Sequence, residues 1–373
     1  MLDGSSSGVS NSPPHRSDDV SVLIPTKNRP HFLLDLLNYY KARRFKGNIL
    51  IGDSSSPDIF NEISDYISRN LSELNIELFH FPDTKPGPVI KRLLNDVVTN
   101  YIVLLSDDDF VLPNSISRCI DFLESNPEYS AAHGKGLLMN AEFRAGRLDV
   151  SSVQDYRQAV CMSDSSAGRV REIFANYAVS GYSVCRREVL IRVLNSVPDS
   201  VGPNYNNAFY DEIIQVSLTA ALGKIAELDI LHLIRLDHGE RGSFGDFDSW
   251  MTQPSWHPSY SDFINKTALL IKEIDGVPYE DALDSANHAF SLYINSNKNR
   301  NGSNIGIVGV IRRFVHRYRL FAPIREKIRL LRFRMGVKSY LLNDDFNAMI
   351  LSIRDSGRVQ RPRSELDPSD SDS

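Results

Sequence analysis

The sequence predicts an α/β protein: a doubly wound, mostly parallel sheet flanked by helices, with a helical C-terminal extension. Two observations support this fold class. Short apolar or β-branched strand patterns alternate four times with helical patterns between residues 20 and 106, as in βαβ units. Beyond about residue 258 the spacing of apolar residues is mostly helical up to residue 354.

Four strands are expected in the first third of the chain. They are VSVLI (20–24), GNILIGD (47–53), IELFHFP (76–82) and YIVLLS (101–106). Helical spacing follows each of them, in HFLLDLLNYYKA (31–42), in the segment starting near Pro57, in GPVIKRLLNDVV (87–98) and in NSISRCIDFLESNP (114–127). Ligands of such sheets bind beyond the carboxyl ends of the strands, so residues there are site candidates.

The pattern changes after Pro113. A strand is expected over 129–140, and residues 141–172 read as polar and irregular. The remaining expected elements are a strand leading into a helix (182–194), a helix (207–223) and strands (224–238). We therefore expect a sheet domain over 19–257, a helical region over 258–354, and Ser-, Gly- and Pro-containing disordered tails over 1–18 and 355–373.

The composition is that of an ordinary globular protein, with 42% hydrophobic and 24% charged residues among 373. A formal net charge of −5 argues against non-specific nucleic-acid binding. The three cysteines have no metal-like spacing and are expected to be buried or free thiols in a reducing compartment. No apolar run is long enough to span a bilayer, and the N-terminus lacks the features of a secretory signal. We expect a cytoplasmic protein.

Three consecutive aspartates, Asp107, Asp108 and Asp109, follow the apolar run 101–105. Adjacent carboxylates repel, so positive charge is expected beside them. They suit Mg²⁺ or Mn²⁺, which takes one or two protein carboxylates and completes its shell with water and substrate phosphate. On an extended backbone Asp108 would point away from its two neighbours. The alternative is a solvated acidic turn that caps the helix after Pro113.

Asp53 ends the second predicted strand, so it is expected at the same edge of the sheet as the three aspartates. Its carboxylate could accept a hydrogen bond from a nucleotide base. The alternative is an N-cap for the helix that starts at Pro57.

Taken in order, six motifs resemble family 2 glycosyltransferases, which use nucleotide sugars and have the GT-A fold. The resemblance covers roughly residues 20–245 and rests on SVLIPTKNRP, ILIGDSSS, GPVIKRLLNDVVTNYIVLLSDDDFVLP, SGYSVCRREVL, YDEIIQ and IRLDHGERGS. In the family such segments form the donor loop, the base-binding aspartate, the DxD-type acidic motif, an Arg-Arg-Glu helix start, the acidic pair with the catalytic base, and a late arginine and histidine before a flexible loop.

The resemblance implies a metal-dependent inverting glycosyltransferase of the hexosyltransferase type. Such an enzyme moves a sugar from a nucleotide-diphosphate sugar to an acceptor hydroxyl. A UDP-sugar donor and a polysaccharide or glycolipid acceptor are expected. The implied donor-binding residues are Pro25, Thr26, Arg29, Asp53, Arg92, Asp107 and Asp108. The implied ligands of Mn²⁺ or Mg²⁺ are Asp108, Asp109 and His238. The general base is assigned to Asp211, with Glu212 as the second choice.

Two positions depart from the family pattern. Ser106 stands where the family often has the first aspartate of its acidic motif, and residues 211–212 read Asp-Glu where the family usually has Glu-Asp. A catalytically inactive relative that binds membrane or partners is therefore a second hypothesis. A nucleotidyltransferase is a third, disfavoured because no glycine-rich, lysine-bearing phosphate loop follows the first strand.

The segment 310–338 carries arginines at helical spacing, interleaved with aliphatic and aromatic residues. Such a helix could lie on an anionic membrane surface, which would place the protein at the inner face of the membrane. Packing of this segment on the rest of the protein, or on a protein partner, are the alternatives.

Overall fold

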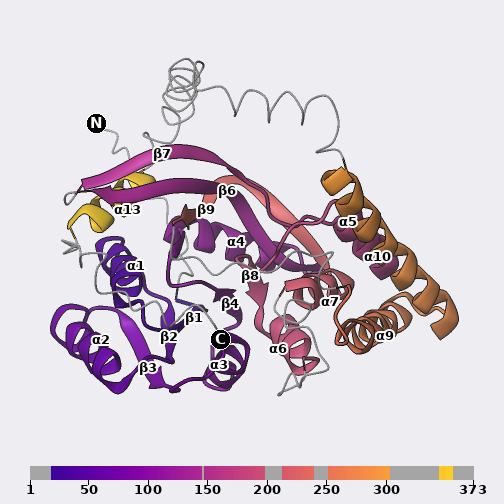
Figure 1. Ribbon diagram of the computed structural model, residues 1–373, viewed down its shortest axis with the longest axis horizontal. Coiled ribbons are helices and arrows are strands. Elements are labelled where there is room, and N and C mark those ends of the chain that lie inside the picture. Colours follow the sequence, from indigo (N-terminus) through magenta and orange to yellow (C-terminus); the bar gives the residue numbers. More distant parts are fainter. Residues whose placement is uncertain (1–17, 145–146, 198–211, 239–250, 303–343, 356–373) are drawn as a thin grey trace, which may run out of the picture.

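The computed structural model describes residues 18–144, 147–197, 212–238, 251–302 and 344–355. In these residues a nine-stranded mixed sheet runs in the order β3-β2-β1-β4-β8-β6-β9-β5, with β7 paired to β6 (Figure 1). The strands are β1 (Val20–Thr26), β2 (Asn48–Asp53), β3 (Asn75–His80), β4 (Tyr101–Leu104), β5 (Asp109–Val111), β6 (Tyr129–Arg144), β7 (Arg147–Tyr156), β8 (Val184–Arg186) and β9 (Lys224–Asp237). The helices are α1 (Pro30–Ala42), α2 (Pro57–Asn70), α3 (Pro86–Leu94), α4 (Pro113–Ser125), α5 (Ser166–Ala175), α6 (Arg187–Asn195), α7 (Ile214–Leu222), α9 (Trp256–Asp275), α10 (Tyr279–Gly302) and α13 (Asp344–Asp355).

The first half of the sheet confirms the prediction. Strands β3, β2, β1 and β4 are parallel neighbours, and almost every residue of β1 and β2 is buried, as expected for strands covered on both faces. Each of α1, α2, α3 and α4 has a proline in its first turn, where the missing N–H costs no hydrogen bond. These prolines fix where the chain leaves each loop, and the loops form the edge that carries the site.

The second half of the sheet is mixed. Strand β8 is antiparallel to both β4 and β6, β6 and β9 are parallel, and the short β5 is antiparallel to β9. The expectation of irregular structure over 141–172 is wrong, because β6 extends to Arg144, β7 pairs with it, and α5 follows. Strand β7 pairs with β6 alone among the described strands, so its sequence needs no continuous apolar pattern.

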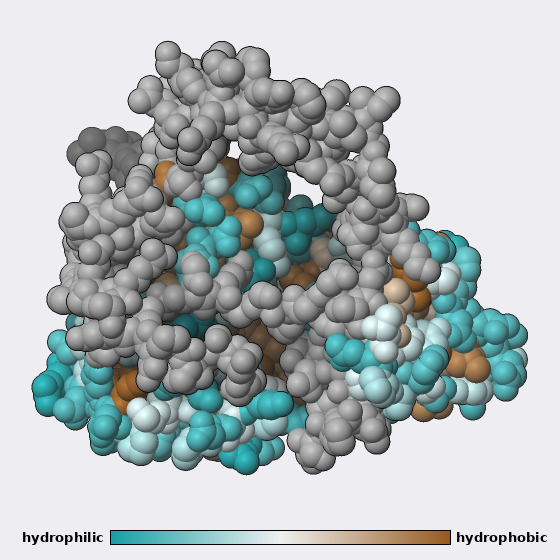
Figure 2. Space-filling model, in the orientation of Figure 1, coloured by the Kyte–Doolittle hydropathy of each residue, from teal (hydrophilic) through white to brown (hydrophobic). Residues whose placement is uncertain are grey.

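Helices cover both faces of the sheet. One core cluster joins α1, α2 and α4 to the strands, and another joins α3, α6 and α7 to the opposite face. A third cluster packs α9 and α10 against α5 and α7 around Phe174, Phe263 and Phe290. On the face seen in Figure 2, residues over α2 and over α9 and α10 are mostly hydrophilic.

The predicted helices of the C-terminal region are present where the structure describes it: α9 and α10 pack on each other, and α13 packs against α1. The basic segment 310–338 and most of both predicted tails lie outside the described residues. In the described part of the chain, no helix is both long and apolar enough to cross a membrane. Cys119, Cys161 and Cys185 are buried free thiols, as expected.

Candidate active site

The three aspartates form a turn between β4 and β5, which we call the acidic turn (Asp107–Asp109). Asp107 is fully buried and accepts hydrogen bonds from Thr26 Oγ1 (2.7 Å) and from the Arg29 guanidinium. A second nitrogen of Arg29 donates to Asp108 Oδ2 at 3.2 Å. Thr26 ends β1 and Arg29 precedes α1, so the first strand and its loop supply the partners of the first two aspartates.

His238 completes this side of the acidic turn. Its Nε2 lies 2.9 Å from Asp108 Oδ2, and its ring packs on Phe32 with the ring centroids 4.3 Å apart. His238 follows directly after β9, so it reaches Asp108 from the second half of the sheet. The predicted residues Thr26, Arg29, Asp107, Asp108 and His238 are therefore brought together.

Asp109 faces a different set of partners. Its Oδ2 accepts from Tyr182 Oη (2.7 Å) and Arg235 Nε (3.0 Å), and its Oδ1 accepts from the backbone N–H of Leu236 (3.1 Å). The Arg235 guanidinium lies over the rings of Tyr156 and Tyr182, with its carbon 4.7 and 5.0 Å from their centroids. Asp109 is thus an anchor for β9.

The expected alternation of the three carboxylates is wrong. Asp107 and Asp108 lie on a turn, so the period-two alternation of an extended strand does not apply to them, and both reach Arg29. Asp109 is the one that differs. The positive charge expected beside the cluster is present, supplied by Arg29 on one side and Arg235 on the other.

Burial separates the protonation behaviour of the three carboxyls. Desolvation raises the pKa of Asp107 to about 7 and that of Asp109 to about 6, although Arg29 and Arg235 respectively act to lower them. Burial also acts to raise the pKa of Asp108, but the hydrogen bond from His238 and the charge of Arg29 outweigh it, and the pKa lies below its usual value. Asp108 is therefore the member that stays ionised most readily.

The predicted metal ligands are brought together only in part. Asp108 and His238 form an oxygen–nitrogen pair, but both oxygens of Asp109 are used by β9 and Tyr182. Within the described residues, no group of three or more His, Cys, Asp or Glu side chains could hold a metal ion. The Asp108–His238 pair fits a divalent cation that draws its other ligands from substrate and water, as Mg²⁺ and Mn²⁺ often do.

A cleft of about 270 Å³ lies beside the acidic turn. Its lining includes Pro25, Ser106, Tyr156, Tyr182, Glu212 and Arg235. The volume is near the lower end for small-molecule sites, and the lining combines aromatic walls with few polar groups. The cleft therefore has the shape and chemistry of a ligand site, at the sheet edge where the sequence predicts one.

Glu212 brings a carboxylate to this cleft from the turn that leads into α7. Its Oε1 accepts a hydrogen bond from Tyr177 Oη at 2.6 Å, which fixes the direction of the carboxylate. Asp211, the first choice for the general base, lies outside the described residues. Glu212 is the described member of the predicted acidic pair that can meet a ligand in the cleft.

Asp53 ends β2 and is fully buried. Its Oδ1 accepts from the backbone N–H of Ser55 (2.8 Å), while Oδ2 has no hydrogen-bond partner among the described residues. The N-cap alternative is not what the structure shows, because Ser56 occupies the N-cap of α2 without a side-chain cap bond. Burying a carboxylate oxygen without a hydrogen-bond partner is unfavourable, so Asp53 Oδ2 is available to accept a hydrogen bond from a ligand.

Arg92 is not joined to the acidic turn. It is exposed on α3, with its guanidinium carbon 5.1 Å from the Phe81 ring centroid, beyond the end of β3. The donor-binding role expected for Arg92 has no supporting contact among the described residues, because its helix face directs the guanidinium toward Phe81.

Four residues that shape the cleft were not predicted individually: Tyr156, Tyr177, Tyr182 and Arg235. Arg235 belongs to the late arginine motif, which was the available signal for it. Tyr182 lies within the SGYSVCRREVL motif, whereas Tyr156 and Tyr177 come from segments with no motif. The β6–β7 and β4–β8 pairings bring Tyr156 and Tyr182 close to Asp109.

Residues 21–190 match the family model described as Glycosyl transferase family 2. These residues form a family 2 glycosyltransferase domain. The domain contains β1 to β4, the acidic turn and Asp53, and its match ends within α6. Glycosyltransferases of this family use nucleotide-sugar donors, and the parallel half-sheet with its acidic turn is GT-A-like. Glu212, Arg235 and His238 lie C-terminal to the matched segment.

Solved structures give distant likenesses to this chain. S. aureus TarS 1–349, described in complex with UDP-GlcNAc, is 13% identical with a TM-score of 0.46, covering 91% of this chain and 90% of that chain. The mannosyltransferase PcManGT from Pyrobaculum calidifontis, described in complex with GDP-Man and Mn²⁺, is 12% identical with a TM-score of 0.40, covering 91% and 88%. A longer TarS structure, 14% identical with a TM-score of 0.46, is covered over 45% of its length by 77% of this chain. No curated protein matches the sequence.

Proposed function

We propose that this protein is a metal-dependent inverting glycosyltransferase that moves a sugar from a nucleotide-diphosphate sugar to an acceptor hydroxyl. The observation that carries the proposal is the convergence of Thr26, Arg29 and His238 on Asp107 and Asp108, beside a cleft that holds the Glu212 carboxylate. This arrangement supplies a place for a charged leaving group next to a cleft that contains a carboxylate able to act as a base.

The donor nucleotide is assigned to the ends of β1 and β2. Asp53 Oδ2 is buried without a partner, so it would accept a hydrogen bond from the imide N–H of a base. Uracil carries one such N–H, and we therefore assign a UDP-sugar. Pro25 lines the cleft and Thr26 follows it, so the first strand would pass beneath the diphosphate.

The leaving diphosphate meets the acidic turn. A Mn²⁺ or Mg²⁺ ion held by Asp108 and His238 would supply Lewis-acid neutralisation of the diphosphate. Arg29 already contacts both Asp107 and Asp108, so its guanidinium can turn from these carboxylates toward an arriving phosphate. Asp109 stays on Arg235 and Tyr182 and keeps the turn in place.

The transfer step needs a base on the acceptor side. The acceptor oxygen bonds to the anomeric carbon as the bond from that carbon to the diphosphate oxygen breaks, and the electron pair leaves with the diphosphate. The acceptor proton passes to a carboxylate, for which Glu212, aimed by Tyr177, is in the cleft. Asp211 is its neighbour in sequence and is tested in parallel. For the acceptor we propose a hydroxyl of a polysaccharide or glycolipid.

Release of UDP tests this function. Purified protein is incubated with a panel of UDP- and GDP-sugars, with Mn²⁺, with Mg²⁺ and with EDTA. We expect metal-dependent UDP release in the wild type, and its loss in Asp108→Ala and in Glu212→Gln or Asp211→Asn, whichever removes the base. No release with any donor, in the wild type and variants alike, would favour a catalytically inactive scaffold.

A further inference from the structure

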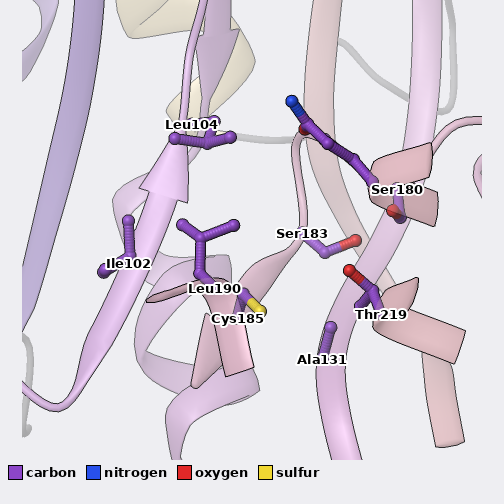
Figure 3. A pocket seen from close by; sticks show the side chains of 10 residues that line it. Ile102, Leu104, Ala131, Ser180, Ser183, Cys185, Leu190 and Thr219 are labelled. Carbon is purple, nitrogen blue, oxygen red and sulfur yellow. The ribbon is translucent and has the colours of Figure 1, made fainter. Parts of the chain in front are cut away.

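A second, smaller cavity adjoins the cleft, and we call it the side pocket. It lies between the sheet and the helices, with Ile102 from β4, Cys185 from β8, Leu190 from α6 and Thr219 from α7 in its wall (Figure 3). Its volume is about 20 Å³. A cavity needs about 10–15 Å³ to hold one water molecule, so the side pocket has room for one group the size of water or methyl.

The side pocket has one apolar wall and one polar wall. In Figure 3, Ile102, Leu104 and Leu190 lie on one side, and the hydroxyl groups of Ser183 and Thr219 face the same space from the other. The lining contains no ionisable carboxylate, amine or guanidinium. An ion is therefore excluded, and an uncharged group with an apolar end and a hydrogen-bonding end is favoured.

The Ser183 hydroxyl favours binding of a hydrogen-bond acceptor at the side pocket. The residue is 2% exposed, and its Oγ has no hydrogen-bond partner among the described residues. Leaving a buried hydroxyl without a partner is unfavourable, and native structures rarely tolerate it without a ligand or a water. The hydroxyl can donate to an incoming carbonyl oxygen.

The side pocket and the cleft adjoin at Ser180 and Gly181. These two residues, together with Leu104 and Gln215, line both cavities. A Cβ built on Gly181 would meet no atom within 4 Å, so a side chain there would enter open space without a clash. A glycine at this shared position adds no side chain between the two cavities.

We propose that the side pocket binds the acyl group of an N-acetylated sugar that sits in the cleft. The methyl group would occupy the side pocket, and the amide carbonyl, outside it on the cleft side, would accept from Ser183 Oγ. The inference deepens the proposed function and rests on it. The N-acetyl group belongs either to the donor sugar or to the acceptor sugar, and both have the same chemistry toward this pocket.

Paired ligands test the inference. Binding of UDP-GlcNAc and UDP-glucose is measured by calorimetry, and transfer is measured with N-acetylglucosaminyl and glucosyl acceptors. We expect the wild type to prefer the acetylated member of one pair by about tenfold or more, since one buried methyl and one hydrogen bond are gained. The donor pair and the acceptor pair identify which sugar carries the group.

Two variants locate the preference in the side pocket. Ala131→Val, which reduces the side pocket from a residue that does not line the cleft, should abolish the preference and leave affinity for the unacetylated ligand within about twofold. Ser183→Ala should reduce the preference by about 2- to 10-fold, the value of one neutral hydrogen bond. Ser125→Ala, which removes an exposed hydroxyl on α4 bonded to the Asp121 carbonyl, is the matched control and should change nothing.

Equal affinity for both members of each pair would overturn the inference, as would variants that weaken both members equally. Crystal structures with UDP-GlcNAc and with an N-acetylglucosaminyl acceptor that both show only an ordered water in the side pocket would also overturn it. Because binding is read separately from turnover, a protein that prefers the acetylated ligand but transfers no sugar would refute the proposed function and retain this inference.

Discussion

The two sides of the acidic turn are built for different purposes. On one side Asp107 and Asp108 share Arg29, and Asp108 meets a histidine from the end of β9. On the other side Asp109 is held by a tyrosine, an arginine and a backbone N–H, and that arginine lies over two tyrosine rings. The first side joins a partly exposed arginine and a histidine to two carboxylates, whereas the second ties strands β5 and β9 together.

This difference shows how one short acidic motif can serve both ligand and fold. Arg29 is the more exposed cation, with 28% of its side chain accessible against 19% for Arg235, so it can exchange a carboxylate for a phosphate. Arg235 has an additional hydrogen bond to Tyr156 Oη at 2.6 Å, which would have to break if it moved. We therefore expect substitutions on the two sides to separate activity from stability.

Asp109→Asn should produce the largest change. It leaves the Arg235 charge without its carboxylate in a largely buried place, and breaking such a pair costs about 3–5 kcal/mol. The free energy of unfolding, measured by urea titration, should fall by about that amount. A loss below about 1 kcal/mol would contradict the anchoring role given to Asp109.

Asp108→Asn should leave the free energy of unfolding within about 1 kcal/mol of the wild type. It should lower metal-dependent transfer by roughly 10²–10³-fold, because the cation that neutralises the leaving diphosphate loses its carboxylate ligand. The readouts are kcat with saturating Mn²⁺ and the urea midpoint. If this variant unfolds as readily as Asp109→Asn, the two sides are not distinct.

His232 belongs with the residues that hold Asp109, because it contacts the backbone of Tyr182. It is fully buried, with Nε2 2.9 Å from the Tyr182 carbonyl oxygen and Nδ1 2.8 Å from Ser115 Oγ, and burial lowers its pKa to about 3. Its neutral form stabilises the fold above the unfolded pKa of about 6.5, and this contribution is lost as pH falls from 6.5 toward 3. The loss should be about 1.4 kcal/mol per pH unit between pH 6 and 4.

Buried Asp107 and Asp109 change the free energy of unfolding with pH in the opposite direction. Their raised pKa values stabilise the folded state as the pH falls. The measurement is therefore the difference in unfolding free energy between the wild type and His232→Gln at several pH values. The gap should narrow as the pH is lowered. A gap independent of pH would mean that His232 does not stay neutral.

Tyr177→Phe gives the smallest expected effect and tests the role of the Glu212 carboxylate in the cleft. The change removes the hydrogen bond to Glu212 Oε1 and keeps the ring between its neighbours. A hydrogen bond to a charged group contributes about 1.5–3 kcal/mol, so kcat should fall by roughly tenfold or more, with the donor KM unchanged. A rise in donor KM at unchanged kcat would place Glu212 in donor binding instead.

The first half of the fold could be predicted because its signals are local. Buried strands such as Val20–Thr26 are apolar throughout, and each of the first four helices starts at a proline. The same regularity identified the strand ends, and with them Asp53 and the acidic turn. Parallel neighbours meet at one edge, so the position of the site followed from the pattern.

The second half depends on pairings that no short segment reveals. Strand β7 is a polar edge strand, and β5 has only three residues, Asp109–Val111, so neither stands out in the sequence. Their long-range pairing is what turns Asp109 away from Asp108 and brings Tyr156 to Arg235. The side pocket likewise depends on packing between β4, β8, α6 and α7.

The most direct measurement is a crystal structure of the protein with UDP and Mn²⁺. We expect the uracil imide on Asp53 Oδ2, the cation on Asp108 and His238 with diphosphate oxygens, and Asp109 still bonded to Arg235. A cation bound through Asp109, or UDP bound away from Asp53 and the acidic turn, would contradict it.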